Sequence, residues 1–275
     1  RSTQGYSSAA SDVYKRQVVK DGQTLNIGEH TLTFAMMTML HWPDNMATYC
    51  AEEKLLFSND AFGQHYATSK RFDDLVDQGA LYYEAKKYFA NILWPYARLI
   101  DKAIAKIAGF DIRIIAPSHG VIWRTNASEI IDLYSKWGRG VCDGSLVIAY
   151  DSMWGGTEKI ARAIARGAQR AGVEVKVFKM SNTPNSTVST EVFTCSGLLV
   201  GSPTLNSGML PTIGSLLVYL KGLNPIGKKV ATFGTFGWAG GAQKDMEEIL
   251  LTCVFRLQID VTCAVSIACQ MKLQM

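Results

Sequence analysis

The chain has 275 residues, of which 48% are hydrophobic and 19% charged, and its formal net charge is +4 at pH 7. This length is enough for two domains, because a single hydrophobic core rarely grows beyond about 250–300 residues. No apolar run approaches the ~20 residues that span a bilayer, so we expect no transmembrane helix. The basic residues are scattered along the chain rather than clustered, which argues against a nucleic-acid partner.

The cysteines form no C-x-x-C pair, and they are Cys50, Cys142, Cys195, Cys253, Cys263 and Cys269. Zinc ribbons and rubredoxin-type centres need such pairs to place two thiolates on one metal, so neither is expected. The chain also lacks a signal-peptide pattern. Free thiols in a reducing compartment follow, and we expect a cytoplasmic protein.

Both ends of the chain depart from the pattern of the rest. Residues 1–17, RSTQGYSSAASDVYKRQ, are small and polar with no strand or helix period, and we interpret them as a non-native leader. Residues 252–275 are an apolar run without a recognisable final helix, which indicates a clipped C-terminus.

The first half of the chain alternates short apolar runs with turns. Asp21-Gly22 predicts a hairpin with a type I′ turn, and Glu52-Glu53 separates a strand pair at 46–50 and 54–57. Apolar groups at helical spacing predict a helix over 80–108, kinked or divided by Pro95. A buried strand at 112–116 follows, then a helix over 128–138 with Ser128 as its N-cap.

From about residue 142 the pattern changes to strands alternating with crossovers. The predicted strands are 145–150, 173–178, 197–200 and 229–233, and a helix runs from the glycine-rich loop to about residue 171. Such alternation predicts a parallel sheet covered on both faces. We therefore expect one domain over 18–141 and a second over 142–275.

Three segments of the first half share one layout, in which an apolar strand leads directly into a polar turn. They are TMLHWPDNM with His41, LLFSNDAFGQH with Asp60, and IIAPSHG with His119. Imidazole and carboxylate at the rim of a sheet suit iron, zinc or manganese. Taken singly, such histidines are more often structural, and an aspartate in a turn is more often a cap, so the pattern alone leaves both interpretations open.

The segments HWPDNM, LLFSNDAFGQH and PSHGVIWR resemble the second half of the metallo-β-lactamase-like domain of flavodiiron proteins, also called A-type flavoproteins. The resemblance implies part of an αββα fold with a non-haem pair of iron ions. It also implies that His41, Asp60 and His119 are metal ligands and catalytic residues, with Asp60 bridging the two metals.

One part of the family pattern is missing. Its H-x-E-x-D-H motif has no match in this sequence and would lie before Val18, so we interpret the chain as N-terminally truncated, with an incomplete diiron site. Half a ligand set binds metal weakly, and the chain is expected to be an impaired enzyme. His65 is a candidate for orienting a ligand, and His30 is assigned no function.

The segment IAYDSMWGGTEKIARAI reads as a strand, a glycine- and hydroxyl-rich loop, and a helix. Backbone N–H groups at a helix N-terminus bind phosphate, and Ser152 and Thr157 can add hydroxyl donors. The loop matches neither G-x-x-x-x-G-K-[ST] nor G-x-G-x-x-G, which argues against ATP and NAD. An ordinary strand–helix turn is the alternative.

Two later loops, GSPTLNSGMLP and FGTFGWAGGAQK, also follow predicted parallel strands. Ligands bind at the carboxyl ends of such strands, and Leu205, Phe236 and Trp238 offer surfaces for a flavin ring. The three loops resemble those of the flavodoxin-like domain of the same family. That resemblance implies FMN, strand order 2-1-3-4-5, and cofactor contacts from Ser152, Met153, Trp154, Gly155, Gly156, Thr157, Ser202, Pro203, Thr204, Leu205, Asn206, Gly234, Thr235, Phe236, Gly237, Trp238 and Gly240.

The resemblance also implies an activity, the reduction of O₂ to water, of NO to N₂O, or of both. Electrons would come from a rubredoxin or an NAD(P)H-linked reductase, in a head-to-tail homodimer or a dimer of dimers. Two alternatives stay open. One is a metallo-β-lactamase-superfamily hydrolase that uses metal-bound hydroxide, and the other is an FMN-binding electron-transfer module with an inactive metal site.

Overall fold

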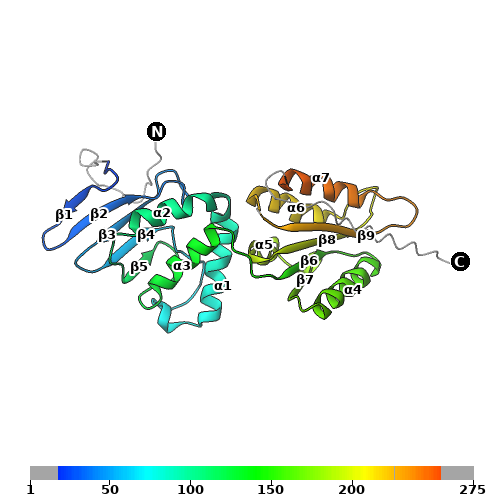
Figure 1. Ribbon diagram of the computed structural model, residues 1–275, viewed down its shortest axis with the longest axis horizontal. Coiled ribbons are helices and arrows are strands. Elements are labelled where there is room, and N and C mark those ends of the chain that lie inside the picture. Colours follow the sequence, from blue (N-terminus) through cyan, green and yellow to red (C-terminus); the bar gives the residue numbers. More distant parts are fainter. Residues whose placement is uncertain (1–17, 226, 255–275) are drawn as a thin grey trace. The chain divides into compact units, whose positions relative to one another are not determined.

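The computed structural model describes residues 18–225 and 227–254, and these divide into two compact units (Figure 1). The first unit contains residues up to 88 and residues 98–138, and the second contains residues 89–97 and those from 139 onward. Within the described part of the chain, no helix is long and apolar enough to cross a membrane. The predicted leader, residues 1–17, lies outside the described residues, as do residues 255–275 of the apolar C-terminal run.

The first unit is built on a five-stranded sheet in sequential order. Its strands are β1 (Thr24–Asn26), β2 (Thr31–Met36), β3 (Met46–Cys50), β4 (Leu55–Asn59) and β5 (Ile114–Pro117). Neighbours are antiparallel except β4 and β5, which run parallel, so both of these strands end at the same edge of the sheet. The predicted strand pair around Glu52-Glu53 is confirmed as β3 and β4.

The predicted hairpin at Asp21-Gly22 is wrong in its position. A turn does form there, with Gln23 N–H donating to Lys20 C=O at 3.0 Å, but only Gly22 has positive φ, at 73°, whereas type I′ needs two such residues. The hairpin instead joins β1 to β2 around Gly28, where φ is 94°. Residues 18–20 therefore form no strand.

The helical pattern over 80–108 is divided near Pro95, as predicted. It consists of α1 (Gln78–Tyr88), a π-helical turn η3 (Phe89–Leu93), a 3₁₀ segment η4 (Trp94–Leu99) and α2 (Ile100–Ile107). Proline has no N–H to donate and clashes with the preceding turn, so the regular helix cannot continue through it.

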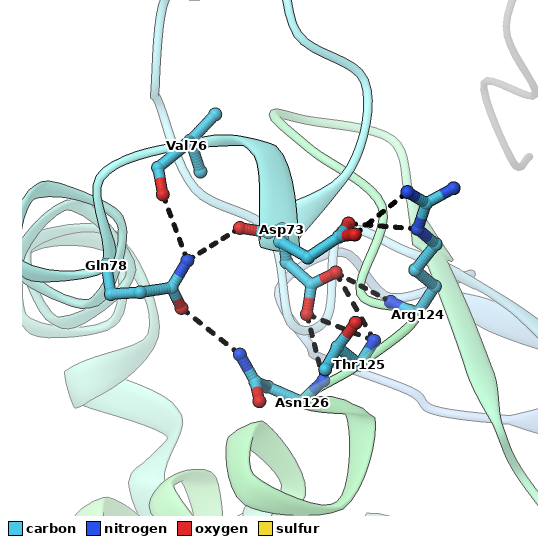
Figure 2. A network of polar contacts seen from close by, with 7 residues as sticks. Asp73, Val76, Gln78, Arg124, Thr125 and Asn126 are labelled. Carbon is cyan, nitrogen blue, oxygen red and sulfur yellow. Dashed lines mark hydrogen bonds and ion pairs between the residues drawn. The ribbon is translucent and has the colours of Figure 1, made fainter.

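The helix predicted over 128–138 is α3 (Ala127–Gly138), and Ser128 lies inside it, so its assignment as N-cap is wrong. The backbone before α3 is held instead by Asp73 from η2 (Asp73–Leu75), as Figure 2 shows. The fully buried Asp73 carboxylate accepts hydrogen bonds from the backbone N–H groups of Arg124 at 3.0 Å, Thr125 at 3.2 Å and Asn126 at 2.8 Å. A distant carboxylate thus supplies the acceptor that a local cap would give.

The second unit is a parallel sheet in the order β7-β6-β8-β9. Its strands are β6 (Leu146–Tyr150), β7 (Val175–Lys179), β8 (Gly197–Pro203) and β9 (Lys229–Thr235). In chain order this is 2-1-3-4, which confirms the flavodoxin-like class; a fifth strand would fall outside the described residues.

Helices cover both faces of this parallel sheet. They are α4 (Gly156–Arg170), α5 (Asn185–Thr194), α6 (Pro211–Leu223) and α7 (Ala242–Val254), and Figure 1 shows α4 on one face with α6 and α7 on the other. Burial on both sides explains why β6 reads as a continuous apolar run, with Val147, Ile148 and Ala149 fully buried.

Candidate metal centre and cofactor loops

The structure brings the three predicted metal ligands together at the edge where β4 and β5 end. His41 Nε2 lies 3.4 Å from Asp60 Oδ2, and His119 Nε2 lies 3.3 Å from Asp60 Oδ1. Each oxygen of one carboxylate therefore faces a different imidazole. The Asp60 side chain is 13% exposed and the histidines are more open to solvent, so a bound ion would sit near the surface of this unit.

A chain of side-chain amides connects the three loops that carry these ligands. Asn45 Nδ2 donates to Leu40 C=O, Asn59 Nδ2 donates to Asn45 Oδ1 at 2.6 Å, and Ser118 Oγ donates to Asn59 Oδ1 at 2.9 Å. Leu40, Asn59 and Ser118 are the residues directly before the three predicted ligands. This row of hydrogen bonds thus orients the three predicted ligands together, as hydrogen-bonded partners of ligands do in known metal sites.

A second clamp joins the segments that follow Asp60 and His119. Buried Gln64 donates through Nε2 to Val121 C=O at 3.0 Å and accepts from Val121 N–H at 2.7 Å, and its own N–H donates to His119 C=O at 3.3 Å. Gly120 has φ of 84°, and a Cβ there would lie 1.3 Å from Gln64 Oε1. Position 120 therefore requires glycine. No local pattern identified Gln64, because its partners lie 57 residues away.

His65 and Tyr88 form an aromatic wall beside His119. The ring of His65 lies 5.4 Å from that of His119 and 4.9 Å, edge-on, from that of Tyr88. Burial, reinforced by the neighbouring charge of His119, lowers the pKa of His65 and favours its neutral form. The Tyr88 hydroxyl is buried without a hydrogen-bond partner in the described structure, and burial together with the charge of Asp60 raises its pKa well above the usual value.

The chemistry of these donors fits iron, and the Asp60 carboxylate with the imidazoles of His41 and His119 would hold such ions here. Among residues 18–225 and 227–254, no three His, Cys, Asp or Glu side chains surround a single point as one metal ion would require. The described residues thus form no complete ligand set for a metal ion. His30 lies elsewhere, paired with Glu53 at 3.0 Å.

The first predicted cofactor loop has the features of a phosphate cradle. Gly155, with φ of 78°, is the N-cap of α4, so the free N–H groups of the helix follow directly. The Ser152 hydroxyl is buried and has no hydrogen-bond partner in the described structure. A buried donor without a partner is costly unless a ligand engages it, and its place beside the helix N-terminus fits a phosphate group.

The first, second and third loops are bonded to one another. Thr157 and Thr235 share a hydroxyl–hydroxyl bond of 3.0 Å, and Thr204 N–H donates to Thr235 C=O at 2.8 Å. A Cβ on Gly234 would lie 2.2 Å from Ser202 C=O, so glycine permits this close approach. The three loops therefore form one continuous rim at the carboxyl ends of β6, β8 and β9.

Not every predicted residue on this rim has a free polar group. The buried Ser202 hydroxyl donates to Pro203 C=O at 2.8 Å and accepts from Leu210 N–H at 2.9 Å. It therefore supports the second loop instead of facing a ligand. A cavity of about 300 Å³ lies among the second and third loops and the start of α7, lined in part by Ser202, Thr204, Gly234, Thr235, Phe236 and Gly240.

The loops also expose apolar side chains that a protein normally buries. Trp154 is 92% exposed and Trp238 is 98% exposed, and Met153, Leu205 and Phe236 are also exposed. Flat indole surfaces beside a phosphate cradle suit an aromatic ring system such as a flavin.

These two sites define a class, a metallo-β-lactamase-like domain joined to a flavodoxin-like domain. Residues 6–120 match the family model described as ODP family beta lactamase, and residues 148–264 match the flavodoxin model. Its relatives and structural neighbours include proteins named nitric oxide reductase, rubredoxin oxygen:oxidoreductase and flavodiiron protein, in agreement with the family that its motifs resemble.

Three comparisons give the extent of this likeness. The chain is 49% identical over 235 residues to a nitric oxide reductase from Moorella thermoacetica, covering 85% of this chain and 59% of that protein. Rubredoxin oxygen:oxidoreductase from Desulfovibrio gigas matches with a TM-score of 0.86 and 38% identity, over 92% of this chain and 63% of that one. The flavodiiron protein from Giardia intestinalis matches with a TM-score of 0.88 and 35% identity, over 94% and 63%.

The chain spans less than two thirds of the length of the curated relatives it matches, for example 62% of the length of a Methanocaldococcus jannaschii protein and 52% of that of a Salmonella flavorubredoxin. The match to the first family model begins within residues 1–17, outside the described residues.

Proposed function

We propose that this chain serves in the reduction of O₂ to water or of NO to N₂O, with electrons passing from FMN to a non-haem diiron centre. The carboxylate of Asp60 carries the proposal, because its two oxygens face His41 and His119 at 3.4 and 3.3 Å, as a bridge between two metals requires. The named activities of the matched Moorella and Desulfovibrio proteins support it.

The residues divide between the two sites. We assign the metal site to a domain over residues 18–141 and the FMN site to a domain over residues 142–275. The helix N-terminus after Gly155, together with Ser152, would hold the phosphate, and Trp154, Leu205, Phe236 and Trp238 would contact the flavin ring. When bound, FMN and the iron pair supply two electrons each, which together match the reduction of O₂ to water.

The walls around Asp60 have their own part in this scheme. The rings of His65 and Tyr88 lie beside His119, and the hydrogen-bonded chain through Asn45 and Asn59 links the loops that carry the three proposed ligands. A rigid ligand geometry favours metal binding because less freedom is lost when the ion binds.

We further propose a head-to-tail homodimer that works in the cytoplasm, with a rubredoxin or an NAD(P)H-linked reductase as the electron donor. In such a dimer the flavin of one subunit serves the metal site of the other. The name of the Desulfovibrio relative, rubredoxin oxygen:oxidoreductase, supports the first type of donor.

A second candidate is an FMN-binding electron-transfer module without an active metal site. One observation favours it, since the described residues supply only part of a diiron ligand set. The hydrolase alternative has no comparable support, because a flavodoxin-like domain has no role in hydrolysis.

Anaerobic reconstitution with FMN and ferrous iron separates these functions. We expect roughly two irons per FMN, as two-metal sites hold, together with consumption of O₂ or NO when the flavin is reduced. Asp60→Ala is the matched variant, and it should lose the iron while retaining FMN. FMN binding without iron would support the electron-transfer module instead, and anaerobic hydrolysis of a β-lactam or thioester would overturn both.

A further inference from the structure

Four basic side chains form a stripe along α4. Lys159, Arg162, Arg166 and Arg170 occur at intervals of three, four and four residues, and all four are exposed. At about 100° per residue these positions share one helix face, over a length of roughly 17 Å. The opposite face, which includes the buried Ala161 and Ala165, packs on the sheet. We call these four residues the α4 basic stripe.

The segment that contains the stripe carries the whole excess charge of the protein. Residues 156–179 hold six basic and two acidic side chains, a net charge of +4, which equals the net charge of the full chain. The other residues hold 22 basic and 22 acidic side chains, and so are neutral in sum. The expectation that the basic residues are scattered is therefore wrong for α4. Basic residues separated by three or four positions in the sequence lie on one face of the helix.

Most of this charge is not neutralised by neighbours. Arg162 pairs with Glu158 at 2.7 Å, and Lys179 at the end of β7 also reaches Glu158, at 3.5 Å. Lys159, Arg166 and Arg170 have no ion pair with any described residue. Three free cations thus face solvent on one helix face, and they generate a positive field that attracts an acidic surface.

The stripe begins beside the proposed flavin site. α4 starts at Gly156, directly after the first cofactor loop, and the exposed indole of Trp154 lies at that end of the helix. Electron-transfer complexes use small, transient interfaces, in which charge complementarity speeds association. An electron donor must dock close to the flavin, and the N-terminal end of the α4 basic stripe lies next to the first cofactor loop.

We propose that the α4 basic stripe docks a small acidic one-electron carrier protein that reduces the flavin. This inference rests on the proposed function for the identity of the partner as a redox protein. Nucleic acid or an anionic membrane would also be attracted by positive charge, but neither accounts for a stripe that starts at the cofactor loop.

The test compares two variants with the same change in charge. The stripe variant carries Lys159→Glu, Arg166→Glu and Arg170→Glu. The control variant carries Lys102→Glu, Lys221→Glu and Lys229→Glu, which are exposed and lie outside the stripe. All six positions are at the surface, so circular dichroism should show both variants folded. The probe is an acidic rubredoxin, and its binding is measured by calorimetry at low ionic strength.

We expect the stripe variant to bind rubredoxin at least about tenfold more weakly, the range over which charge steers association, and to lose the salt dependence of binding. In stopped-flow experiments, flavin reduction by rubredoxin should slow in parallel, whereas reduction by dithionite should be unchanged. The control variant should bind within roughly twofold of wild type, as expected for charges outside the interface.

Equal rubredoxin binding by the stripe variant and wild type would overturn the inference. So would a stripe variant that binds rubredoxin normally but loses affinity for duplex DNA or for vesicles with phosphatidylserine. Calorimetry of rubredoxin binding needs no bound flavin. Failure of the chain to take up FMN would refute the proposed function, and the comparison of rubredoxin binding by the two variants would still test the docking inference separately.

Discussion

The hydroxyl groups of Ser152 and Ser202 lie on the same rim but in different states of hydrogen bonding. That of Ser152 is buried without a partner, whereas that of Ser202 is engaged with Pro203 and Leu210. Both are serines, but Ser152 follows the end of β6, whereas Ser202 lies within β8. Their surroundings therefore separate a group that is free to bind from a group that supports the loop.

We expect Ser152→Ala to weaken FMN binding by about tenfold or more, because a hydrogen bond to a charged group contributes roughly 1.5–3 kcal/mol. The stability of the flavin-free protein should not fall. Ser202→Ala should instead lower the free energy of unfolding by about 1 kcal/mol, the usual contribution of one hydrogen bond, with a smaller effect on FMN. Flavin fluorescence titration and urea unfolding measure the two effects. Equal losses of FMN affinity would contradict the distinction.

The Cys195 thiol should be chemically inert in the native protein. It is fully buried, and burial raises its pKa to about 12 from an ordinary value near 9. At pH 8 only about one thiol in ten thousand is then ionised, and the thiolate is the reactive form. We expect iodoacetamide to modify the partly exposed Cys142 well before Cys195, as followed by peptide mass spectrometry.

The raised pKa of Cys195 also makes the free energy of unfolding depend on pH. The unfolded chain loses the Cys195 proton more readily than the folded one, so this contribution to stability is complete below pH 9 and declines as the pH rises toward 12.

The control for the iodoacetamide experiment is labelling in urea, where both thiols should react. Native labelling of Cys195 at the rate of Cys142 would show that the site opens to solvent.

At the scale of elements, the start of α3 depends on a residue from outside the helix. Asp73 in η2 binds the backbone of residues 124–126, and Gln78 at the start of α1 donates to Asp73 C=O at 2.7 Å and accepts from Asn126 Nδ2 at 3.1 Å (Figure 2). Two elements more than 40 residues apart in sequence are thus tied at one point.

Asp73→Ala should lower the free energy of unfolding by about 3 kcal/mol, because three part-buried backbone N–H groups lose a buried, charged acceptor. The neighbouring Asp74 is a matched control. Its carboxylate bonds to the exposed side chain of Arg124 at 2.9 Å, and solvent screens that ion pair, so Asp74→Ala should change stability little. Urea unfolding followed by circular dichroism compares the two. A loss for Asp74→Ala as large as that for Asp73→Ala would refute the role of burial.

At the scale of the whole molecule, each compact unit has its own core. In the second unit Ile148, Tyr150, Ala161 and Phe233 form a buried cluster between α4 and the sheet. The first unit buries Leu56, Ile115, Trp123 and other apolar side chains. Separate cores are expected to unfold as separate cooperative units.

Scanning calorimetry should therefore show two transitions, of which FMN shifts only one. At about 100 times its dissociation constant, a ligand stabilises its domain by roughly 2.7 kcal/mol, which raises the Tm by roughly 10 °C for a unit of this size. Iron should have no effect on the flavin-sensitive transition. A single transition that FMN shifts as a whole would show that the two units unfold together.

The amino-acid sequence by itself determined the features that rest on local pattern. Apolar periodicity predicts β3, β4 and the parallel strands β6 to β9, the position of Pro95 predicts the division of the helix before α2, and the motif segments point to the flavodiiron family. These predictions hold because steric preferences of the backbone and burial of alternate or continuous apolar faces act within a few residues.

Only the tertiary structure decided which polar groups meet. The hairpin formed around Gly28 instead of Asp21-Gly22, and Asp73 replaced Ser128 at the start of α3. The amide chain through Asn59 likewise joins residues 59 positions apart. Hydrogen bonds and charge fields depend on distances in space, and the path of the folded chain sets those distances.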